Sequence, residues 1–163
     1  MFIGLLSDTH TTFDAPLRSF FEEVDQIWHA GDFGNIETAD AIAAFKPLIG
    51  VHGNCDDHKV RTVYPVMQCF EIEQMKVLML HIGGHPGYYD YQARSLITAH
   101  RPDLFICGHS HILRVMNDKK LNLLYINPGA AGNSGIHTQR TAVRFKINNG
   151  RVSDLEVWEL KRQ

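Results

Sequence analysis

The stretch Phe2-Ile3-Gly4-Leu5-Leu6-Ser7-Asp8-Thr9-His10 joins a short apolar run to a cluster of polar residues. An apolar run of this length is typical of a strand buried on both faces. The same arrangement occurs four more times. Gly31-Asp32 follows the run Gln26 to Ala30, and His52-Gly53-Asn54-Cys55-Asp56 follows the run Leu48 to Val51. His81 follows the run Val77 to Leu80, and Gly108-His109-Ser110-His111 follows the run Leu104 to Cys107. These five segments predict a sheet-based fold with a functional site at the strand ends.

Helical patterns connect the first three strands. A helix is predicted around Leu17 to Glu23, because Pro16 needs no backbone partner in a first helical turn. A second helix is predicted from Thr38 to Phe45, where alanines favour helix formation, and Pro47 ends it. Strands separated by single helices pair in parallel through right-handed crossovers.

The second half of the chain is richer in antiparallel patterns. One helix is predicted from Tyr91 to His100, just before Arg101-Pro102. Three strand pairs are predicted. Gln68 to Ile72 pairs with Lys76 to Leu80, Leu113 to Met116 pairs with Leu121 to Ile126, and Thr141 to Ile147 pairs with Val152 to Leu160. The fold class we expect is α/β, with two mixed sheets packed face to face and helices outside.

Length and composition indicate one globular domain over residues 1–163. Hydrophobic residues make up 44% and charged residues 21%, which excludes a disordered chain. The net charge of -2 gives no basic surface, so no nucleic-acid polymer is expected as a partner. No apolar run reaches the ~20 residues of a membrane span, and Met1 to Leu6 lacks the basic flank of a signal peptide. Three scattered cysteines, Cys55, Cys69 and Cys107, predict no disulfide framework and favour the reducing cytoplasm.

Seven side chains at the predicted strand ends are of metal-ligand type. The carboxyl ends of parallel strands share one edge of a sheet, so we expect these side chains to meet there: Asp8, His10, Asp32, Asn54, His81, His109 and His111. Seven ligands are too many for one tetrahedral zinc ion and suit two ions that share a ligand. Asp32 is the natural bridge, because a carboxylate has two oxygens. The donors are nitrogen and oxygen only, which suits Mn²⁺, Fe²⁺ or Zn²⁺.

The blocks Asp8-x-His10, Gly31-Asp32, Gly53-Asn54, His81 and Gly108-His109-x-His111 resemble those of the calcineurin-like metallophosphoesterases. The likeness is to their small bacterial and archaeal phosphodiesterase branch, related to the small subunit of retromer, and it extends to Asn127-Pro128-Gly129. The resemblance implies a four-layer α/β-β/α sandwich and two divalent ions, Mn²⁺ first, with Fe²⁺, Zn²⁺ and Ni²⁺ as alternatives. It also implies one ion held by Asp8, His10, Asp32 and His111, and the other by Asp32, Asn54, His81 and His109.

Two positions depart from the family's pattern. Cys55 stands where family members often carry a histidine that protonates the leaving group, and its thiol, with an ordinary pKa of ~8.5, is a poorer hydrogen-bond partner. The alternative is that Cys55 only fills space. The family's His-Gly-His is stretched here to His81-Ile82-Gly83-Gly84-His85, and His85 is expected to take the second histidine's place near the substrate. With these two, the residues expected to act in catalysis are Asp32, Asn54, Cys55, His85 and His109.

The function we predict is a binuclear metal-dependent phosphodiesterase that hydrolyses a small phosphodiester by attack of a metal-bridging hydroxide. One alternative is a metal-binding scaffold for protein contacts, as the small subunit of retromer uses its surface. A second alternative is a phosphomonoesterase or nucleotide hydrolase, although the nearby loops supply few of the cationic groups that a monoester needs. A homo-oligomer is left open. Other histidines, among them His29 and His137, are expected to be packed or surface residues rather than ligands.

Overall fold

The first of two five-stranded sheets contains the N-terminal parallel strands. The computed structural model describes residues 1–162. In this sheet the strand order is β12-β11-β1-β2-β3, with bounds Arg151–Lys161, Gln139–Asn148, Phe2–Leu6, Gln26–His29 and Leu48–Gly50. The pairs β1·β2 and β2·β3 are parallel, as expected from the helical connections, whereas β11 pairs antiparallel with both β1 and β12.

The second sheet is built from the hairpins of the later chain. Its strand order is β4-β5-β8-β10-β9, with bounds Met67–Ile72, Met75–Leu80, Leu104–Ile106, Leu123–Pro128 and Leu113–Asp118. The central pairs β5·β8 and β8·β10 are parallel, and the two outer pairs are antiparallel. A short hairpin of β6 (Gly84–His85) and β7 (Tyr88–Tyr89) lies between β5 and the last helix of the chain.

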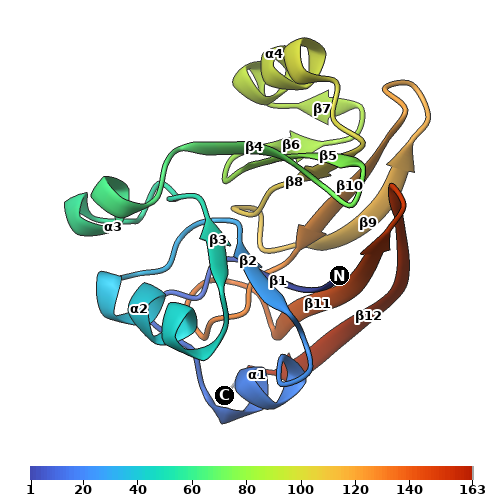
Figure 1. Ribbon diagram of the computed structural model, residues 1–163. Coiled ribbons are helices and arrows are strands. Elements are labelled where there is room, and N and C mark those ends of the chain that lie inside the picture. The colour runs from blue at the N-terminus through green and yellow to red at the C-terminus, as the bar shows by residue number, and fades with distance from the viewer. Residues whose placement is uncertain (163) are drawn as a thin grey trace.

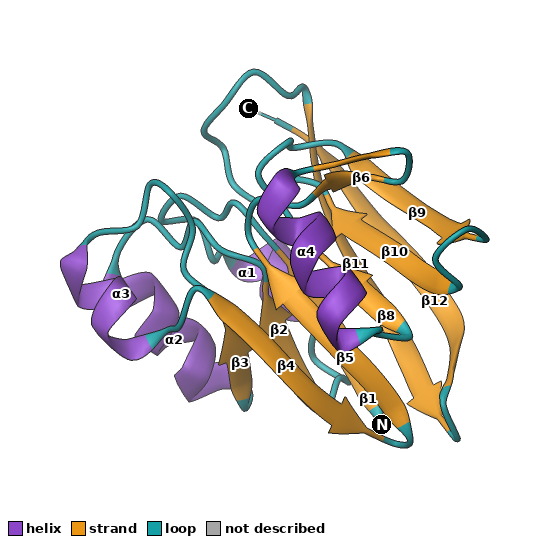
Figure 2. Ribbon diagram, turned by 90° about the horizontal axis from the view of Figure 1, so that it is seen from above, coloured by secondary structure: helices purple, strands orange, loops and turns teal. Residues whose placement is uncertain are grey.

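Helices cover the outer faces of the two sheets, which gives four layers (Figure 1). The helices are α1 (Ala15–Phe20), α2 (Ile36–Phe45), α3 (His58–Val63) and α4 (Tyr91–His100). Seen from above, α4 crosses over the second sheet, and α2 and α3 lie to the side of β3 (Figure 2). Within residues 1–162 the longest helices have ten residues each, about half of what a bilayer crossing requires.

Alternating burial along the strands explains the layering. Leu5 and Trp28 point to the core between the sheets, whereas their neighbours Leu6 and Ile27 pack against the helices on the outer face. In β5, Met79 likewise joins the inner core, and the residues on either side of it join a third cluster under α4. All these side chains are fully or almost fully buried. The predicted four-layer α/β-β/α sandwich of two mixed sheets is confirmed.

Several elements differ from the sequence-based predictions, among them the β6·β7 hairpin, which was not predicted, and α2, which begins at Ile36 and not at Thr38. The first helix spans Ala15–Phe20 rather than Leu17 to Glu23, because Phe21 turns into the core, where it is fully buried. Helix α3 was not predicted, although its N-cap Asp57 accepts a hydrogen bond from the backbone of Val60 at 3.0 Å. The strand predicted at Leu121 to Ile126 is Leu123–Pro128. Its start is later because Asp118 Oδ1 accepts the backbone N–H groups of residues 120 and 121 and holds them in a turn.

Candidate metal centre

Five strand ends from both sheets converge on one site. The loops after β1, β2 and β3 carry Asp8 and His10, Asp32, and Asn54, while the loops after β5 and β8 carry His81, His109 and His111. Within each sheet a backbone hydrogen bond joins neighbouring loops: Asp8 N–H donates to the Gly31 carbonyl at 2.9 Å, and Gly108 N–H donates to the His81 carbonyl at 2.9 Å. Between the sheets, the His109 N–H donates to Asp8 Oδ2 at 3.0 Å. The site therefore lies where the two sheets meet, at the carboxyl ends of their parallel strands.

His81 lies at the centre of the cluster. Its Nδ1 is 2.7 Å from the carbonyl oxygen of Ala30, so Nδ1 carries a proton and donates it. Its Nε2 faces three oxygens, at 3.1 Å from Asn54 Oδ1, 3.3 Å from Asp32 Oδ2 and 3.9 Å from Asp8 Oδ1. A neutral ring would aim its Nε2 lone pair at oxygen acceptors, so this arrangement requires a proton or a metal ion among them. The donor set fits a divalent cation.

Asp8 is completely buried and shares its oxygens between several partners. Its Oδ2 accepts hydrogen bonds from Ser7 Oγ at 2.6 Å and from the backbone N–H of His109 at 3.0 Å. Its Oδ1 lies 3.1 Å from His111 Nε2 and 4.0 Å from His10 Nε2. Because Oδ2 is satisfied by protein donors, Oδ1 is the atom left to face a cation.

Two groups in the described chain have ligand atoms close enough to hold a metal ion: Asp8 with His10 and His111, and Asp8 with Asp32 and His81. Asp8 belongs to both groups. Asp32 also faces both, because its Oδ2 lies 3.9 Å from His10 Nε2 as well as 3.3 Å from His81 Nε2. His109 flanks the second group, with its ring centroid 5.3 Å from that of His81. All seven predicted ligands thus lie around one site.

The protonation equilibria of the cluster favour charged groups. Burial alone would raise the pKa of Asp8, but the hydrogen bond to His111 and the charge of His81 outweigh it and lower that pKa. Burial is also outweighed at Asp32, whose pKa is lowered by its hydrogen bond to His81 and by the charge of that ring. Burial disfavours a charged His81, yet the hydrogen bond to Asp32 and both carboxylates raise the pKa of its ring. Two buried carboxylates in this site therefore stay ionised and need compensating positive charge.

Left-handed backbone conformations are concentrated at the ligands. Five of the seven have positive φ: Asp8 (53°), His10 (42°), Asp32 (59°), His109 (67°) and His111 (59°). For residues with a side chain this conformation costs ~1–2 kcal/mol each, and it persists only where the surrounding structure holds it. The strand ends bend sharply so that several side chains can face one point.

Two further polar side chains hold the ligand loops, and neither was predicted as a site residue. Asp56, nearly buried, accepts the backbone N–H groups of Asp32 at 3.0 Å and Gly53 at 2.8 Å. Asn127, also buried, donates through Nδ2 to the Gly108 carbonyl at 2.8 Å. Asp56 lies two residues after Asn54, and Asn127 lies directly before Pro128, so their positions in these sequence blocks were the available signal.

Two buried or half-buried histidines also support the loops. His29 Nδ1 accepts the backbone N–H of Gly31 at 3.1 Å, and its Nε2 lies 2.9 Å from Thr9 Oγ1. Burial lowers the pKa of His29 to about 3, so the ring is neutral. His137 lies 3.1 Å from His111, Nδ1 to Nδ1, and burial lowers its pKa as well. His29 is packed, as expected. The contact of His137 with His111 was not expected, because no apolar run directly precedes His137 in the sequence.

Cys55 and His85 lie beside the cluster rather than in it. Cys55 is exposed, and its Sγ accepts a hydrogen bond from Asn54 Nδ2 at 3.3 Å. Partial burial and the Asp32 carboxylate raise the pKa of the Cys55 thiol, so it keeps its proton at neutral pH. His85 Nδ1 donates to the Pro86 carbonyl at 3.1 Å, and its ring lines a small cavity of about 80 Å³ together with Ser110 and Arg114.

Comparisons with known proteins agree with this architecture. Residues 1–150 match the calcineurin-like phosphoesterase superfamily domain. A probable metallophosphoesterase of Methanothermobacter thermautotrophicus is 32% identical over 143 residues, which cover 80% of this chain and 77% of that protein.

Solved structures show the same fold at low sequence identity. Vps29 of Chaetomium thermophilum superposes with a TM-score of 0.76 at 14% identity, and zinc-bound Vps29 of Entamoeba histolytica with a TM-score of 0.73 at 16% identity. In both cases the similarity covers 100% of each chain. By its matching domain, its archaeal relative and its strand-end cluster, this chain belongs to the calcineurin-like phosphoesterase superfamily.

Proposed function

We propose that this protein is a binuclear metal-dependent phosphodiesterase that hydrolyses a small phosphodiester. The observation that carries the proposal is the convergence of two ionised carboxylates, Asp8 and Asp32, with the Nε2 atoms of three histidines around one buried point. Nitrogen and oxygen donors of this kind suit Mn²⁺, Fe²⁺, Zn²⁺ or Ni²⁺. Mn²⁺ is the ion we expect first.

Charge balance supports two ions rather than one. The carboxylates of Asp8 and Asp32 contribute two negative charges inside the protein, where they are almost inaccessible to water. One divalent ion would only neutralise them, whereas two leave a net charge of about +2, which attracts the phosphate anion of a diester. Asp8 and Asp32 both face the two candidate groups, and Asp32 is our proposed bridging ligand.

The proposed chemistry divides between the ions and the protein. Two divalent ions held by the cluster around Asp8 and Asp32 would supply positive charge for the phosphate oxygens and would lower the pKa of a bound water molecule. Asp32 and Asn54 fix the side of the site next to His81, and His109 closes it. We assign the Cys55 thiol, which is protonated and exposed, to donate a proton toward the leaving oxygen, and His85 Nε2 to contact a phosphoryl oxygen.

A groove beside Asn54 and His81 supports a small substrate. It has a volume of about 180 Å³ and is lined by apolar Val66 and Ile82 as well as by Arg61 and Gln92. Arg61 is already committed to the protein backbone, because its guanidinium donates to the carbonyls of residues 53, 54 and 56. Without a free cation at this position, the groove suits the single charge of a diester better than the double charge of a monoester.

The experiment is a titration of metal-stripped protein with Mn²⁺, followed by hydrolysis of bis(4-nitrophenyl) phosphate. We expect turnover to appear as about two ions bind per chain. Asp32→Asn should lose both turnover and one ion, whereas Asp40→Asn, at an exposed position of α2, should behave as the wild type. Failure to bind metal would overturn the proposal, and faster hydrolysis of 4-nitrophenyl phosphate would replace it with a monoesterase.

The second candidate function is a metal-binding scaffold for protein contacts. The structural neighbours named Vps29 support it, because they share the fold over their whole length. In the same titration, a scaffold would bind two ions tightly and show no turnover even with the activated 4-nitrophenyl leaving group.

A further inference from the structure

We propose that His137 is a positioning residue that fixes the ring and the tautomer of His111, one of the candidate metal ligands. This inference rests on the metal centre proposed above, but it concerns a residue outside the ligand set. His137 lies in the loop between β10 and β11, 26 positions after His111 in the chain. The two rings stand nearly perpendicular, with an interplanar angle of 80° and centroids 4.9 Å apart.

The direction of the hydrogen bonds follows from the far side of the His137 ring. Its Nε2 lies 2.9 Å from the carbonyl oxygen of Gly132. A carbonyl oxygen only accepts, so Nε2 carries the proton, and Nδ1 of the neutral ring is an acceptor. Nδ1 of His111 lies 3.1 Å from that acceptor and must therefore donate to it. Nδ1 of His111 thus carries a proton, which leaves Nε2 as the nitrogen that would bind a metal ion.

Nε2 of His111 points into the metal cluster. It lies 3.1 Å from Asp8 Oδ1, the oxygen that Ser7 and His109 leave free. A metal ion takes the lone pair of a neutral imidazole nitrogen, and the ring's other nitrogen decides which tautomer is present. Outer partners of metal-bound histidines are most often carboxylates, backbone carbonyls or water. A second histidine fills that role here.

The surrounding loop is shaped to bring the two rings together. Gly135 has a φ of +127°, and a Cβ at this position would lie 2.6 Å from His111 Nδ1 and 3.0 Å from His137 Nδ1. Gly132 connects the loop to the cluster, because its N–H donates to the backbone carbonyl of Asp8 at 3.0 Å. Ile136 is fully exposed, while the polar side chain of His137 turns inward. These contacts are expected of a support for His111 and not of a solvated loop.

The test compares zinc binding by three variants, measured by competition with a chromophoric chelator. His137→Leu should weaken the binding of one of the two zinc ions by ~10–100-fold. His137→Asn should stay close to the wild type, because its amide oxygen can accept from His111 Nδ1–H. Gly135→Ala should weaken zinc binding without removing an imidazole, because the added methyl group separates the rings. Circular dichroism establishes that each variant is folded.

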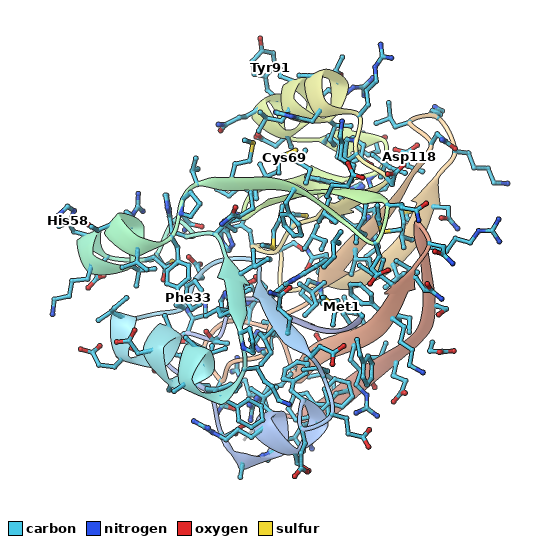
Figure 3. The ribbon with its side chains drawn as sticks, viewed as in Figure 1. Met1, Phe33, His58, Cys69, Tyr91 and Asp118 are labelled. Carbon is cyan, nitrogen blue, oxygen red and sulfur yellow. The ribbon has the colours of Figure 1, made fainter. Side chains whose placement is uncertain are left out.

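A spectroscopic measurement separates positioning from general stabilisation. In the ¹⁵N-labelled, zinc-loaded wild type, NMR should detect a coupling across the N–H···N hydrogen bond between the two Nδ1 atoms, with the proton on His111. His58→Leu serves as the control, because His58 is exposed at the outer end of α3 (Figure 3) and should leave zinc binding and the coupling unchanged.

The outcomes are distinct. Wild-type zinc affinity in both His137→Leu and Gly135→Ala, or a proton on His137 Nδ1, would overturn the role of His137 while leaving the metal centre intact. A wild type that binds no zinc would overturn the metal centre itself, and this inference with it.

Discussion

His29 lies beneath the loops that carry Asp8, His10 and Asp32, and its neutral ring serves both of its neighbours. Nδ1 accepts from Gly31 N–H, so Nε2 carries the proton and donates to Thr9 Oγ1, which in turn donates to the Phe33 carbonyl at 3.1 Å. The ring also stacks on Phe33, with centroids 3.6 Å apart. A proton on Nδ1 would remove the acceptor for Gly31 and place a charge in a fully buried position.

The stability of the fold should therefore depend on pH through His29. Its pKa is about 3 in the folded chain and ~6.5 in the unfolded chain, so the unfolded state binds the additional proton and stability falls as pH drops below 6.5. Between pH 7 and pH 5 this histidine alone should reduce the free energy of unfolding by about 2 kcal/mol. In urea denaturation of the metal-free proteins, the free energy of unfolding of His29→Gln should fall between pH 7 and pH 5 by about 2 kcal/mol less than that of the wild type. The variant should nevertheless be less stable than the wild type at pH 7. A control, His58→Gln, should keep the wild-type pH dependence.

Cys55 is the residue at which we expect a gain in activity. Its thiol stands next to Asn54 and is exposed, but a thiol is a weak hydrogen-bond donor. Cys55→His should hydrolyse diesters with unactivated alcohol leaving groups about 100-fold faster, at the lower end of the ~10²–10⁴-fold that a positioned general acid contributes. The rate with 4-nitrophenyl leaving groups should change little, since these need no proton. An unchanged or lower rate with unactivated diesters would show that Cys55 only fills space.

At the scale of elements, the ligand loops depend on glycines that let two strand ends approach each other. A Cβ at Gly53 would overlap Asp32 Oδ1 and lie 2.5 Å from the Asp32 backbone nitrogen. Gly53→Ala should therefore displace the loop after β3 from the loop after β2, with a loss of ~1–3 kcal/mol in the free energy of unfolding and weaker metal binding. Gly87→Ala is a control for metal binding, because nothing lies within 4 Å of a Cβ there; its φ of +91°, unlike that of Gly53, is positive, so this variant can lose stability but should keep its metal affinity. Equal metal affinity in both variants would contradict this account.

The elements also show what the sequence could predict. The apolar runs predicted the buried strands to within one or two residues, and α4 spans Tyr91–His100 as predicted, because Asp90 caps it and Arg101-Pro102 ends it. The ligand positions followed from the rule that parallel strands share an edge. The support of His111 by His137 was not predictable, because it depends on the path of the loop between β10 and β11, nine residues after the end of β10. Side-chain patterns carry no periodic signal for such a contact.

At the scale of the whole molecule, the two sheets share the site. Asp8, His10 and Asp32 follow strands of the first sheet, whereas His81 and His111 follow strands of the second. Away from the site the contact between the sheets is mostly apolar, through residues such as Trp28, Val77 and Phe145, with a hydrogen bond from Gln68 Nε2 to the Gly50 carbonyl at 3.3 Å. An apolar core holds two sheets together without specifying the position of one edge against the other. Ions bound across the sheets would add that constraint, because each ion contacts ligands from both.

Metal binding should accordingly stabilise the entire fold and not only its loops. An ion that binds only the folded state at 100 times its Kd adds about 2.7 kcal/mol, which corresponds to a rise in Tm of roughly 5–10 °C for a chain of this size. Calorimetry of metal-stripped protein with and without Mn²⁺ measures this shift. Asp8→Asn should abolish most of it, because Asp8 belongs to both candidate groups, and Asp40→Asn should retain it in full. Since the ligands join both sheets, a single unfolding transition should shift to higher temperature when Mn²⁺ is added. A second transition whose temperature does not change with Mn²⁺ would mean that the sheets unfold independently.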